Sequence, residues 1–270
     1  MAHSNSPLNL VCADADDVCV WSEMRRQASE YAVKEVALSS LLHATVLGQE
    51  NLGSAMVNHL AEKLSSSDFS ALKMRTVLAE ALESDPELVP CIARDLQAVF
   101  QRDPACHSHL QCFLYFKGFL AIQTHRCAHA LYKSGRDLVA YHLQSRGSEL
   151  FGVDINPAAQ IGCGIMLDHA TGFVMGETAR LGNDCSILQG VTLGGTGKAE
   201  EDRHPKIGDR VLIGANASVL GNIIIGNGAK IAAGSVVLKA VPENCTVAGV
   251  PAKPVGGSCG DPASAMDQCL

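Results

Sequence analysis

The chain has 270 residues, of which 47% are hydrophobic, and a net charge of −7. This length allows one or two domains with a sizeable core, and the acidic balance gives no basic surface that would indicate a nucleic-acid partner. No uninterrupted run of about eighteen apolar residues is available to span a bilayer, and no basic segment followed by an apolar run opens the sequence, so we expect a cytoplasmic protein. The eleven cysteines are odd in number and include no Cys-x-x-Cys pair, which favours reduced thiols over a disulfide framework.

The first half of the sequence is expected to fold into an all-α domain, assigned to residues 1–150, with residues 1–20 disordered or forming an arm. Apolar side chains there return with helical rather than alternating spacing. Ser54 is a candidate N-cap, Asp103 stops a helix because the residue before a proline avoids the helical region, and Gly135 suits a C-terminal cap. The predicted helices cover residues 20–48, 54–64, 68–85, 88–102, 109–134 and 136–145, the last leading to Gly147.

The second half is dominated by aliphatic residues that return at every sixth position. Neither a helix nor an alternating strand produces that period, whereas short strands and turns repeated along a parallel β-helix do. No aromatic residue follows Phe173, which suits the narrow interior of a triangular coil. An all-β domain that is merely rich in Ile and Gly is the alternative. The leading positions of the repeat are Ile155, Ile161, Leu167, Phe173, Leu181, Ile187, Leu193, Ile207, Ile213, Val219, Ile225, Ile231 and Val237.

We therefore assign residues 151–257 to a parallel β-helix. Residues 258–270 are rich in Gly, Ser and Asp and are expected to form a flexible, disordered tail. The polar, Gly-rich segment 194–205 is interpreted as a loop that projects from one coil. A prism with flat outer faces favours self-association with cyclic symmetry, and the helices can cover one of its ends.

The repeat needs Leu167, but it has no use for the acid and the imidazole of Asp168 and His169, which follow. We expect His169 at an outward-pointing corner, facing a groove if subunits pack side by side. Asp154 lies about one coil earlier, so it can stack beside His169. A carboxylate that holds one imidazole nitrogen leaves the other free to act as a base. A solvated histidine on a turn is the alternative.

Two features of the projecting loop indicate ligand binding, because the repeat does not require them to form the fold. Arg203, followed by His204, offers a planar guanidinium suited to a carboxylate, and an ordinary exposed loop charge is the alternative. The Gly-rich stretch at Gly195 and Thr196 lacks the spacing of a nucleotide-binding loop, so close backbone approach to an extended ligand fits better than an NTPase. A zinc site like that of β-helical carbonic anhydrases needs three histidines, and only His169 and His204 follow residue 150, so no metal is expected.

These segments resemble those of the serine O-acetyltransferases, a family of hexapeptide-repeat acyltransferases. The resemblance extends from about residue 103 to residue 256, while residues 1–100 match only as a helical class. It implies a left-handed parallel β-helix after the helical domain, and direct transfer of the acetyl group of acetyl-CoA to the hydroxyl of L-serine in cysteine biosynthesis, without an acyl-enzyme. The segments that carry it include Asp103-Pro104-Ala105, Lys117-Gly118-Phe119, Val153-Asp154-Ile155-Asn156-Pro157, Leu167-Asp168-His169-Ala170-Thr171-Gly172 and Asp202-Arg203-His204-Pro205.

The resemblance also implies roles for individual residues. The general base of the family matches His169, and the acid that partners it matches Asp154. Asp103 and Asp168 are implied to accept the substrate ammonium and Arg203 to bind its carboxylate, which selects an α-amino acid. The implied serine-binding positions are Asp103, Asp168, Arg203 and His204, and coenzyme A is implied to lie near Gly195, Thr196, Ala215, Lys230 and Ala233.

Partners follow from the same likeness. Members of the family are trimers through the β-helix, often paired into hexamers through the helical domain, and L-cysteine is expected as a feedback inhibitor at the serine site. The family's tail inserts into O-acetylserine sulfhydrylase and ends in Ile, whereas Leu270 keeps the apolar end without the β-branch. Asn216 and Ala232 replace common glycines, and asparagine tolerates a left-handed turn. The competing functions are another hexapeptide-repeat acetyltransferase and a scaffold that only binds the sulfhydrylase.

Overall fold

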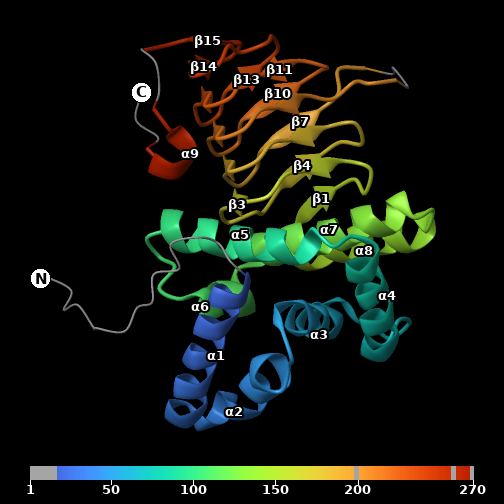
Figure 1. Cartoon of the computed structure of the whole chain (residues 1–270). Helices are drawn as coiled ribbons and strands as arrows, with labels where there is room; N and C mark the ends of the chain where they lie inside the picture. Colours follow the sequence, from blue (N-terminus) through green and yellow to red (C-terminus); the bar gives the residue numbers. More distant parts are fainter. Residues whose placement is uncertain (1–16, 198–200, 257–259, 268–270) are drawn as a thin grey trace, which may run out of the picture.

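The structure is a computed structural model of the chain that describes residues 17–197, 201–256 and 260–267. Helices form one end of the molecule and a stack of short strands forms the other (Figure 1). The helices are α1 (Asp17–Lys34), α2 (Val36–Leu42), the π-helical turn η1 (His43–Leu47), α3 (Leu52–Leu64), α4 (Ala71–Ser84), α5 (Leu88–Arg102), α6 (His109–Tyr115), α7 (Lys117–Lys133), α8 (Asp137–Phe151) and α9 (Pro262–Ala265).

The helical prediction for the first half is confirmed, with corrections at boundaries. α5 ends at Arg102, immediately before Asp103-Pro104, as expected from the proline. Ser54 as the N-cap of α3 is wrong: Asn51 is the cap. The Asn51 side chain accepts a hydrogen bond from Ser54 N at 2.9 Å, while the Ser54 hydroxyl accepts one from Asn51 N at 3.2 Å. This reciprocal capping box satisfies two amide groups, so the helix starts before Ser54.

The single long helix predicted over 109–134 is wrong, because the chain breaks into α6 and α7 at Phe116. The backbone of Phe116 is extended, with φ −80° and ψ 104°. Just beyond the break, a Cβ atom on Gly118 would lie 1.9 Å from the carbonyl oxygen of Leu167. The break therefore directs the start of α7 against the first coil, a tertiary contact that helical periodicity does not encode.

The last long helix, α8, continues through Gly147 and ends at Gly152, which adopts a left-handed φ of 66°. The predicted end at residue 145 is therefore too early. Gly147 lies against Thr124 of α7, where an added Cβ atom would meet the Thr124 methyl group at 3.6 Å. That is an ordinary contact distance, so the packing of α7 on α8 does not require a glycine at 147, and Gly152 supplies the cap.

The hexapeptide repeat forms the parallel β-solenoid that the sequence predicts. Every leading residue of the repeat lies in a strand, and all of them except the partly exposed Ile161 are buried in the prism. The strands are β1 (Val153–Ile155), β2 (Gln160–Ile161), β3 (Met166–Leu167), β4 (Phe173–Met175), β5 (Arg180–Leu181), β6 (Ser186–Ile187), β7 (Thr192–Gly194), β8 (Lys206–Ile207), β9 (Leu212–Ile213), β10 (Ser218–Leu220), β11 (Ile224–Ile225), β12 (Lys230–Ile231), β13 (Val236–Val237), β14 (Thr246–Gly249) and β15 (Ala252–Pro254).

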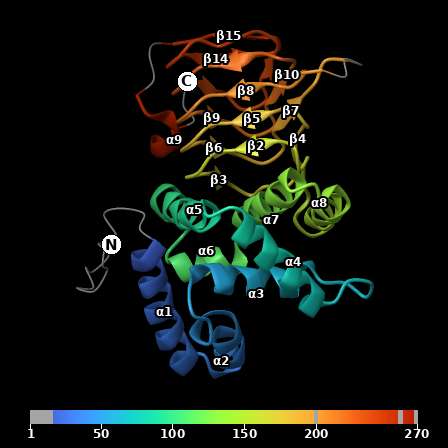
Figure 2. The same cartoon turned by 45° about the vertical axis from the view of Figure 1, so that its right-hand side comes forward.

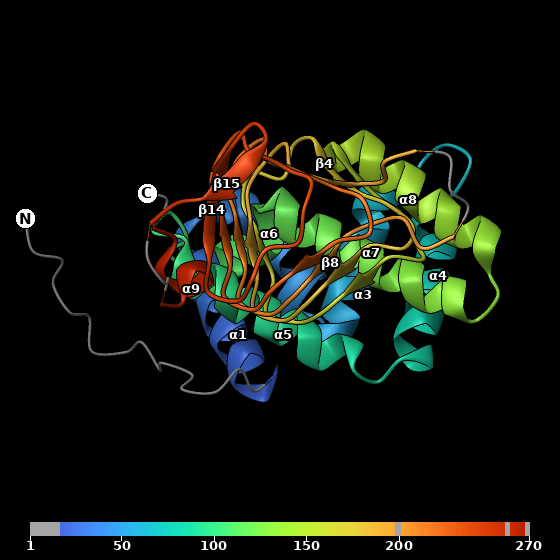
Figure 3. The same cartoon turned by 90° about the horizontal axis from the view of Figure 1, so that it is seen from above.

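Three sheets make the faces of the prism. Sheet A has the order β1-β4-β7-β10-β13, sheet B has β11-β8-β5-β2, and sheet C has β15-β14-β12-β9-β6-β3. All pairings are parallel except β14 with β15. Each turn of the chain visits the three sheets in succession, so edges of the prism form between sheets C and A, A and B, and B and C. Seen from above, the solenoid stands over α5 and α7 (Figure 3).

A buried ion pair joins α5 and α7 to the first coil. Arg126 donates to Asp95 at 2.8 Å and to the carbonyl oxygen of Gly162 at 2.6 Å. Asp95, which is fully buried, also accepts a hydrogen bond from Ile165 N at 2.8 Å. The helices and the solenoid therefore share one polar junction, located where α5 and α7 lie against β3; Figure 2 shows how these elements are arranged.

The expectation that the cysteines are reduced is wrong for Cys91 and Cys163, which form a disulfide between α5 and the turn before β3. Cys19 is also disulfide-bonded. The partners Cys91 and Cys163 are 72 residues apart in the sequence, and only the docking of α5 on the solenoid brings them together. The free cysteines of the described residues are Cys106, Cys112, Cys127, Cys185 and Cys245.

Part of the predicted disordered tail is folded. Helix α9 lies on sheet C, where the hydroxyl of Ser186 donates to the carbonyl oxygen of Ala263 at 2.8 Å, and Ala263 is fully buried. The rest of the tail prediction falls partly on residues 257–259 and 268–270, which are outside the described residues. The predicted N-terminal arm is wrong for residues 17–20, which belong to α1 because Val20 is buried in the core, and its remainder, residues 1–16, is outside the described residues. Across residues 17–197, 201–256 and 260–267, no helix has the length and apolar character to cross a membrane. The cytoplasmic location stays a prediction.

Candidate active site

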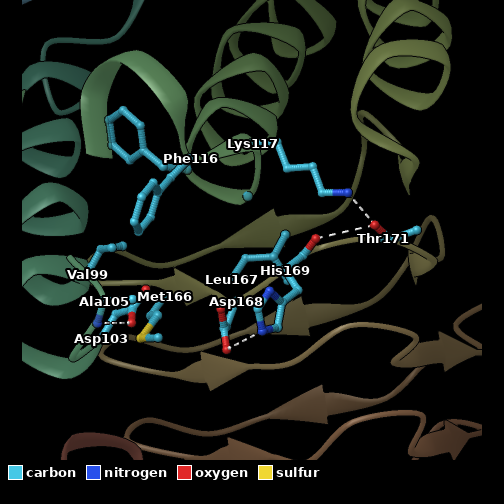
Figure 4. Close-up of a pocket in the computed structure, with 12 residues that line it drawn as sticks. Val99, Asp103, Ala105, Phe116, Lys117, Met166, Leu167, Asp168, His169 and Thr171 are labelled. Atoms are coloured by element: carbon cyan, nitrogen blue, oxygen red, sulfur yellow. Dashed lines mark hydrogen bonds and ion pairs between the residues drawn. The ribbon is translucent and has the colours of Figure 1, made fainter. Parts of the chain in front are cut away.

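A cavity of about 380 Å³ opens where the helices meet the first coil. Its walls come from the segment after α5, the start of α7 and the turn between β3 and β4 (Figure 4). Among the predicted site residues, this cavity brings together Asp103, Asp168 and His169. Asp103 lies more than sixty residues before Asp168 and His169 in the sequence, so it is the fold that brings the three side chains together.

His169 stands at the edge between sheets C and A, the outward corner that the sequence predicts. Its imidazole Nε2 lies 3.6 Å from a carboxylate oxygen of Asp168, and its side chain is 72% exposed. The backbone is left-handed at His169 (φ 56°) and again at Ala170 (φ 60°). This turn presents the ring to the cavity, where it is accessible to a ligand (Figure 4).

Two carboxylates share the cavity with the imidazole. Burial raises the pKa of Asp168; the neighbouring imidazole of His169 opposes this shift, and the carboxylate of Asp103 reinforces it. Asp103 holds its orientation by accepting a hydrogen bond from Ala105 N at 2.8 Å. Two acids and a base in one partly enclosed space suit a ligand that carries an ammonium group next to a proton to be removed.

The predicted stacking of Asp154 beside His169 is not what the structure has. Asp154 lies on the outer face of sheet A, in register with Val174, and accepts a hydrogen bond from Gln144 Nε2 at 2.6 Å. Neither of the two residues, both described, has a hydrogen bond or ion pair with the other. The first coil is longer than an ideal turn of three hexapeptides. Asp154 is therefore in register with Val174 of β4 and not with the turn that carries His169.

Arg203 and His204 lie on a different edge of the prism, between sheets A and B. Arg203 is paired with Glu177 at 2.7 Å. His204 is 7% exposed, and its Nδ1 lies 2.9 Å from the hydroxyl of Thr178. Burial lowers the pKa of His204, which favours the neutral ring. Within one chain these two residues are separated from His169 by the width of sheet A.

The residues expected near coenzyme A fall in three places. Ala215 and Ala233 lie on the edge that carries His169, linked by the hydrogen bond from Gly234 N to Ala215 O at 2.8 Å. Gly195 and Thr196 lie on the edge of Arg203, where an added Cβ atom on Gly195 would come 3.4 Å from the Arg203 carbonyl oxygen. Lys230 lies in β12 on sheet C and is 6% exposed. Residues 198–200 of the projecting loop are outside the described residues.

Sequence reasoning missed two polar residues of the cavity. Lys117 and Thr171 both line it, and the Lys117 ammonium hydrogen-bonds the Thr171 hydroxyl (Figure 4). Both belong to segments quoted for the family resemblance, yet neither was given a role. Among the described residues, no group of three or more His, Cys, Asp or Glu side chains is arranged to hold a metal ion.

Comparisons with known proteins agree with this geometry. The family described as "Serine acetyltransferase, N-terminal" matches residues 20–124, and "Bacterial transferase hexapeptide (six repeats)" matches residues 204–239. A serine acetyltransferase of Escherichia coli (strain K12) is 54% identical over 250 residues, which is 92% of each chain. The serine acetyltransferase of Neisseria gonorrhoeae, solved in complex with serine, is 55% identical with a TM-score of 0.85, over 88% of this chain and 97% of that one. That of Brucella abortus strain S19, solved in complex with coenzyme A, is 52% identical with a TM-score of 0.87, over 89% and 97%.

Proposed function

The chain belongs to the serine acetyltransferase family, and we propose that it builds each active site from the His169 cavity of one protomer and the Arg203 edge of the next. The reaction is the transfer of the acetyl group of acetyl-CoA to the hydroxyl of L-serine, giving O-acetyl-L-serine and coenzyme A. The roles of the individual residues are the proposal. The observation that carries it is the meeting of Asp103, Asp168 and His169 in one cavity.

The proposed chemistry uses His169 as a general base. The neutral imidazole takes the serine hydroxyl proton as the oxygen attacks the thioester carbonyl, which forms the C–O bond of a tetrahedral intermediate. Collapse of that intermediate breaks the C–S bond, and the imidazolium returns the proton to the departing thiolate. A positioned base of this kind contributes roughly 10²–10⁴ in rate. Asp103 and Asp168 hold the substrate ammonium, whose positive charge favours the ionised form of Asp168 against the effect of burial on its pKa.

Asp154 is proposed to orient His169 in the assembled site. Its side chain is exposed on sheet A, next to the edge on which His169 stands, and accepts a hydrogen bond from Gln144. If the Asp154 carboxylate releases Gln144 and accepts a hydrogen bond from the His169 imidazole instead, that bond fixes the ring tautomer and leaves the other ring nitrogen free. Replacement by asparagine tests this role, since Asp154→Asn is then expected to lower kcat with little change in the KM for serine.

A trimer in which sheet A faces the threefold axis would complete the site. The row of outward side chains on sheet A, running from Val174 through Thr192 and Ser218 to Val236, is uncharged. By contrast, the row on sheet B includes Arg180 and Lys206, and sheet C is partly covered by α9. Sheet A is bounded by the His169 edge on one side and the Arg203 edge on the other. Cyclic packing therefore sets the two edges of neighbouring protomers side by side.

In this arrangement Arg203 of one protomer binds the serine carboxylate held at His169 of its neighbour, and His204 supports that contact. Coenzyme A follows the groove between protomers, past Ala215 and Ala233 on one wall and Gly195 and Thr196 on the other. Lys230 lies in β12 on sheet C, beside this groove rather than on either of its walls. L-cysteine, which has the α-amino acid group of serine with a thiol for the hydroxyl, is proposed to compete for the same contacts.

Higher assembly is proposed to use the helical end. Exposed apolar side chains cluster on α1 and α2, and Val33 and Val36 are 83% and 79% exposed. Burial of such a patch would pair two trimers into a hexamer. The tail beyond α9 is proposed to bind O-acetylserine sulfhydrylase through its apolar end at Leu270.

Mixing of inactive variants tests the shared site. His169→Ala and the double variant Arg203→Ala/His204→Ala are each expected to be nearly inactive. Coexpressed in equal amounts, they should restore about a quarter of the wild-type activity, because random trimers leave about one intact site in four. As a control, His169→Ala mixed with Asp168→Ala, two changes on one edge, should restore nothing. Activity no higher than the sum of the parents in the first mixture would contradict the shared site.

A further inference from the structure

The turn that carries His169 is strained in a way that its neighbours along the same edge are not. His169 and Ala170 are two successive non-glycine residues with positive φ, 56° and 60°. In later coils the positive φ at this edge falls on Gly190, Asn216 and Gly234, residue types that tolerate it. The left-handed conformation of other residues costs free energy and persists only where the surroundings enforce it.

A chain of hydrogen bonds from α7 supplies that enforcement. The ammonium of Lys117 donates to the hydroxyl of Thr171, and this hydroxyl lies 3.4 Å from the carbonyl oxygen of His169, to which it donates (Figure 4). The amide of Thr171 donates to the same carbonyl at 2.7 Å. The hydroxyl thus accepts from a cation and donates to a carbonyl, which strengthens both bonds.

Packing at the start of α7 holds the other side of the turn. Gly118, the residue after Lys117, is so close that an added Cβ atom would lie 1.9 Å from the carbonyl oxygen of Leu167 and 3.3 Å from the Cβ atom of Ala170. Ala170 is fully buried. The first turn of α7 therefore contacts residues on both sides of His169, while the imidazole itself is exposed and lies 3.6 Å from a carboxylate oxygen of Asp168.

We propose that Lys117 and Thr171 form a clamp that positions the catalytic imidazole by fixing the backbone of His169. They are positioning residues, since they act through His169 rather than on the substrate. The inference rests on the proposed role of His169 as the base. Because the side chain of His169 is 72% exposed, its backbone determines where the ring points. A small misplacement of a catalytic group reduces the rate by up to about 100-fold.

Steady-state kinetics of the full-length enzyme test the clamp. Thr171→Val keeps the shape of the side chain and removes the hydroxyl, while Lys117→Met keeps its length and removes the charge. Each is expected to lower kcat roughly 10-fold, with the KM values for serine and acetyl-CoA changed less than about twofold. Thr171→Ser, which retains the hydroxyl, should recover most of the loss. Lys133→Met, the same change at the other end of α7, should leave kcat unaltered.

Two further variants separate positioning from a general structural role. Lys117→Met/Thr171→Val should lose no more than either single change, because the two residues act as one unit. In a His169→Ala background, Thr171→Val should cost nothing more, since no imidazole remains to be positioned. A raised KM with unchanged kcat in Lys117→Met would overturn the proposal by showing direct ligand contact. So would equal damage from Thr171→Ser and Thr171→Val, or an additional loss without His169.

The proposal and its premise can fail separately. If His169→Ala retains wild-type activity, the assignment of the base is wrong and the clamp has nothing to position. If His169→Ala is inactive while Thr171→Val and Lys117→Met keep full kcat, only the clamp is wrong. Thermal unfolding of every variant, compared with Lys133→Met, verifies that the losses do not come from misfolding.

Discussion

The later coils of the solenoid and the junction between helices and solenoid are built by different rules. From Lys206 to Val237, each strand pairs with the strand one coil away in the same register, and the interior is filled by one aliphatic residue per strand. The junction instead depends on single contacts between distant segments, such as Arg102 with the carbonyl oxygen of Gly164 at 3.1 Å. The repeated coils determine the shape of the solenoid. The cavity with His169 forms where the first coil meets the helices α5 and α7, which do not repeat.

This difference predicts that damage to the junction and damage to the coils will have separate signatures. The largest expected effect is on catalysis. His169→Ala should lower kcat by roughly 10²–10⁴, because it removes the proposed base from an exposed position. The melting temperature should stay within about 2 °C of the wild type, since no packing is lost. The matched control is His43→Ala, an exposed histidine in the helical region, which should retain activity. A His169→Ala enzyme with normal kcat would rule out the mechanism.

The next largest effect is expected from the buried ion pair of the junction. Asp95→Ala leaves the Arg126 guanidinium, which is 6% exposed, without its counter-charge. Removal of one partner of a buried pair typically costs about 3–5 kcal/mol. Urea unfolding at a fixed protein concentration measures this loss. The comparison is Glu80→Ala, which breaks the surface pair with Arg136 and should cost at most about 1 kcal/mol. Equal losses in the two variants would mean that the buried pair does not hold the junction.

The solenoid could be predicted from the sequence because the hexapeptide pattern that produces it is local. A leading residue every six positions determines which side chains point inward, and the buried series from Ile207 to Val237 confirms it. The loop from residue 194 and the helix stop at Asp103 were also foreseen, because proline and glycine act on their own neighbours. The same reasoning placed His169 on an outer corner, since an imidazole has no place in the prism.

The contacts that complete the site were beyond the sequence because they depend on docking. The break at Phe116 and the disulfide of Cys91 with Cys163 both result from α5 and α7 meeting the first coil. The stacking of Asp154 beside His169 failed because it assumed a coil of ideal length, whereas the register pairs Asp154 with Val174. Lys117 and Thr171 were quoted for their likeness to a family, but only the folded chain shows that they touch.

The coils themselves are expected to respond to core substitutions without a change in chemistry. Ile225→Ala removes a fully buried side chain from the prism and should cost about 2–5 kcal/mol in the free energy of unfolding. The adjacent Ile224 points outward and is 65% exposed, so Ile224→Ala should cost less than about 0.5 kcal/mol. The kcat of both folded variants should match the wild type. A large fall in kcat for Ile225→Ala would show that the later coils contribute to the site beyond shape.

The smallest effect per step is the dependence of stability on pH that two buried histidines give to the helical region. Burial lowers the pKa of His59 to about 4 and that of His125 to about 3, while an unfolded histidine titrates near ~6.5. Below that value the unfolded chain binds protons that the folded chain does not. The stabilising contribution is therefore complete above pH ~6.5 and is lost as the pH falls toward the folded pKa, by roughly 1.4 kcal/mol per pH unit for each residue.

Urea unfolding at pH 7 and pH 5 distinguishes the two regions by this slope. His125→Gln should reduce the difference in the free energy of unfolding between pH 7 and pH 5 by roughly 2 kcal/mol, because the glutamine does not titrate. Ile225→Ala should lower the free energy of unfolding by the same amount at both pH values, because a cavity in the prism has no proton to bind. If His125→Gln leaves the slope as it was, the acid sensitivity does not come from this buried ring, and the helical end and the coils cannot be told apart by pH.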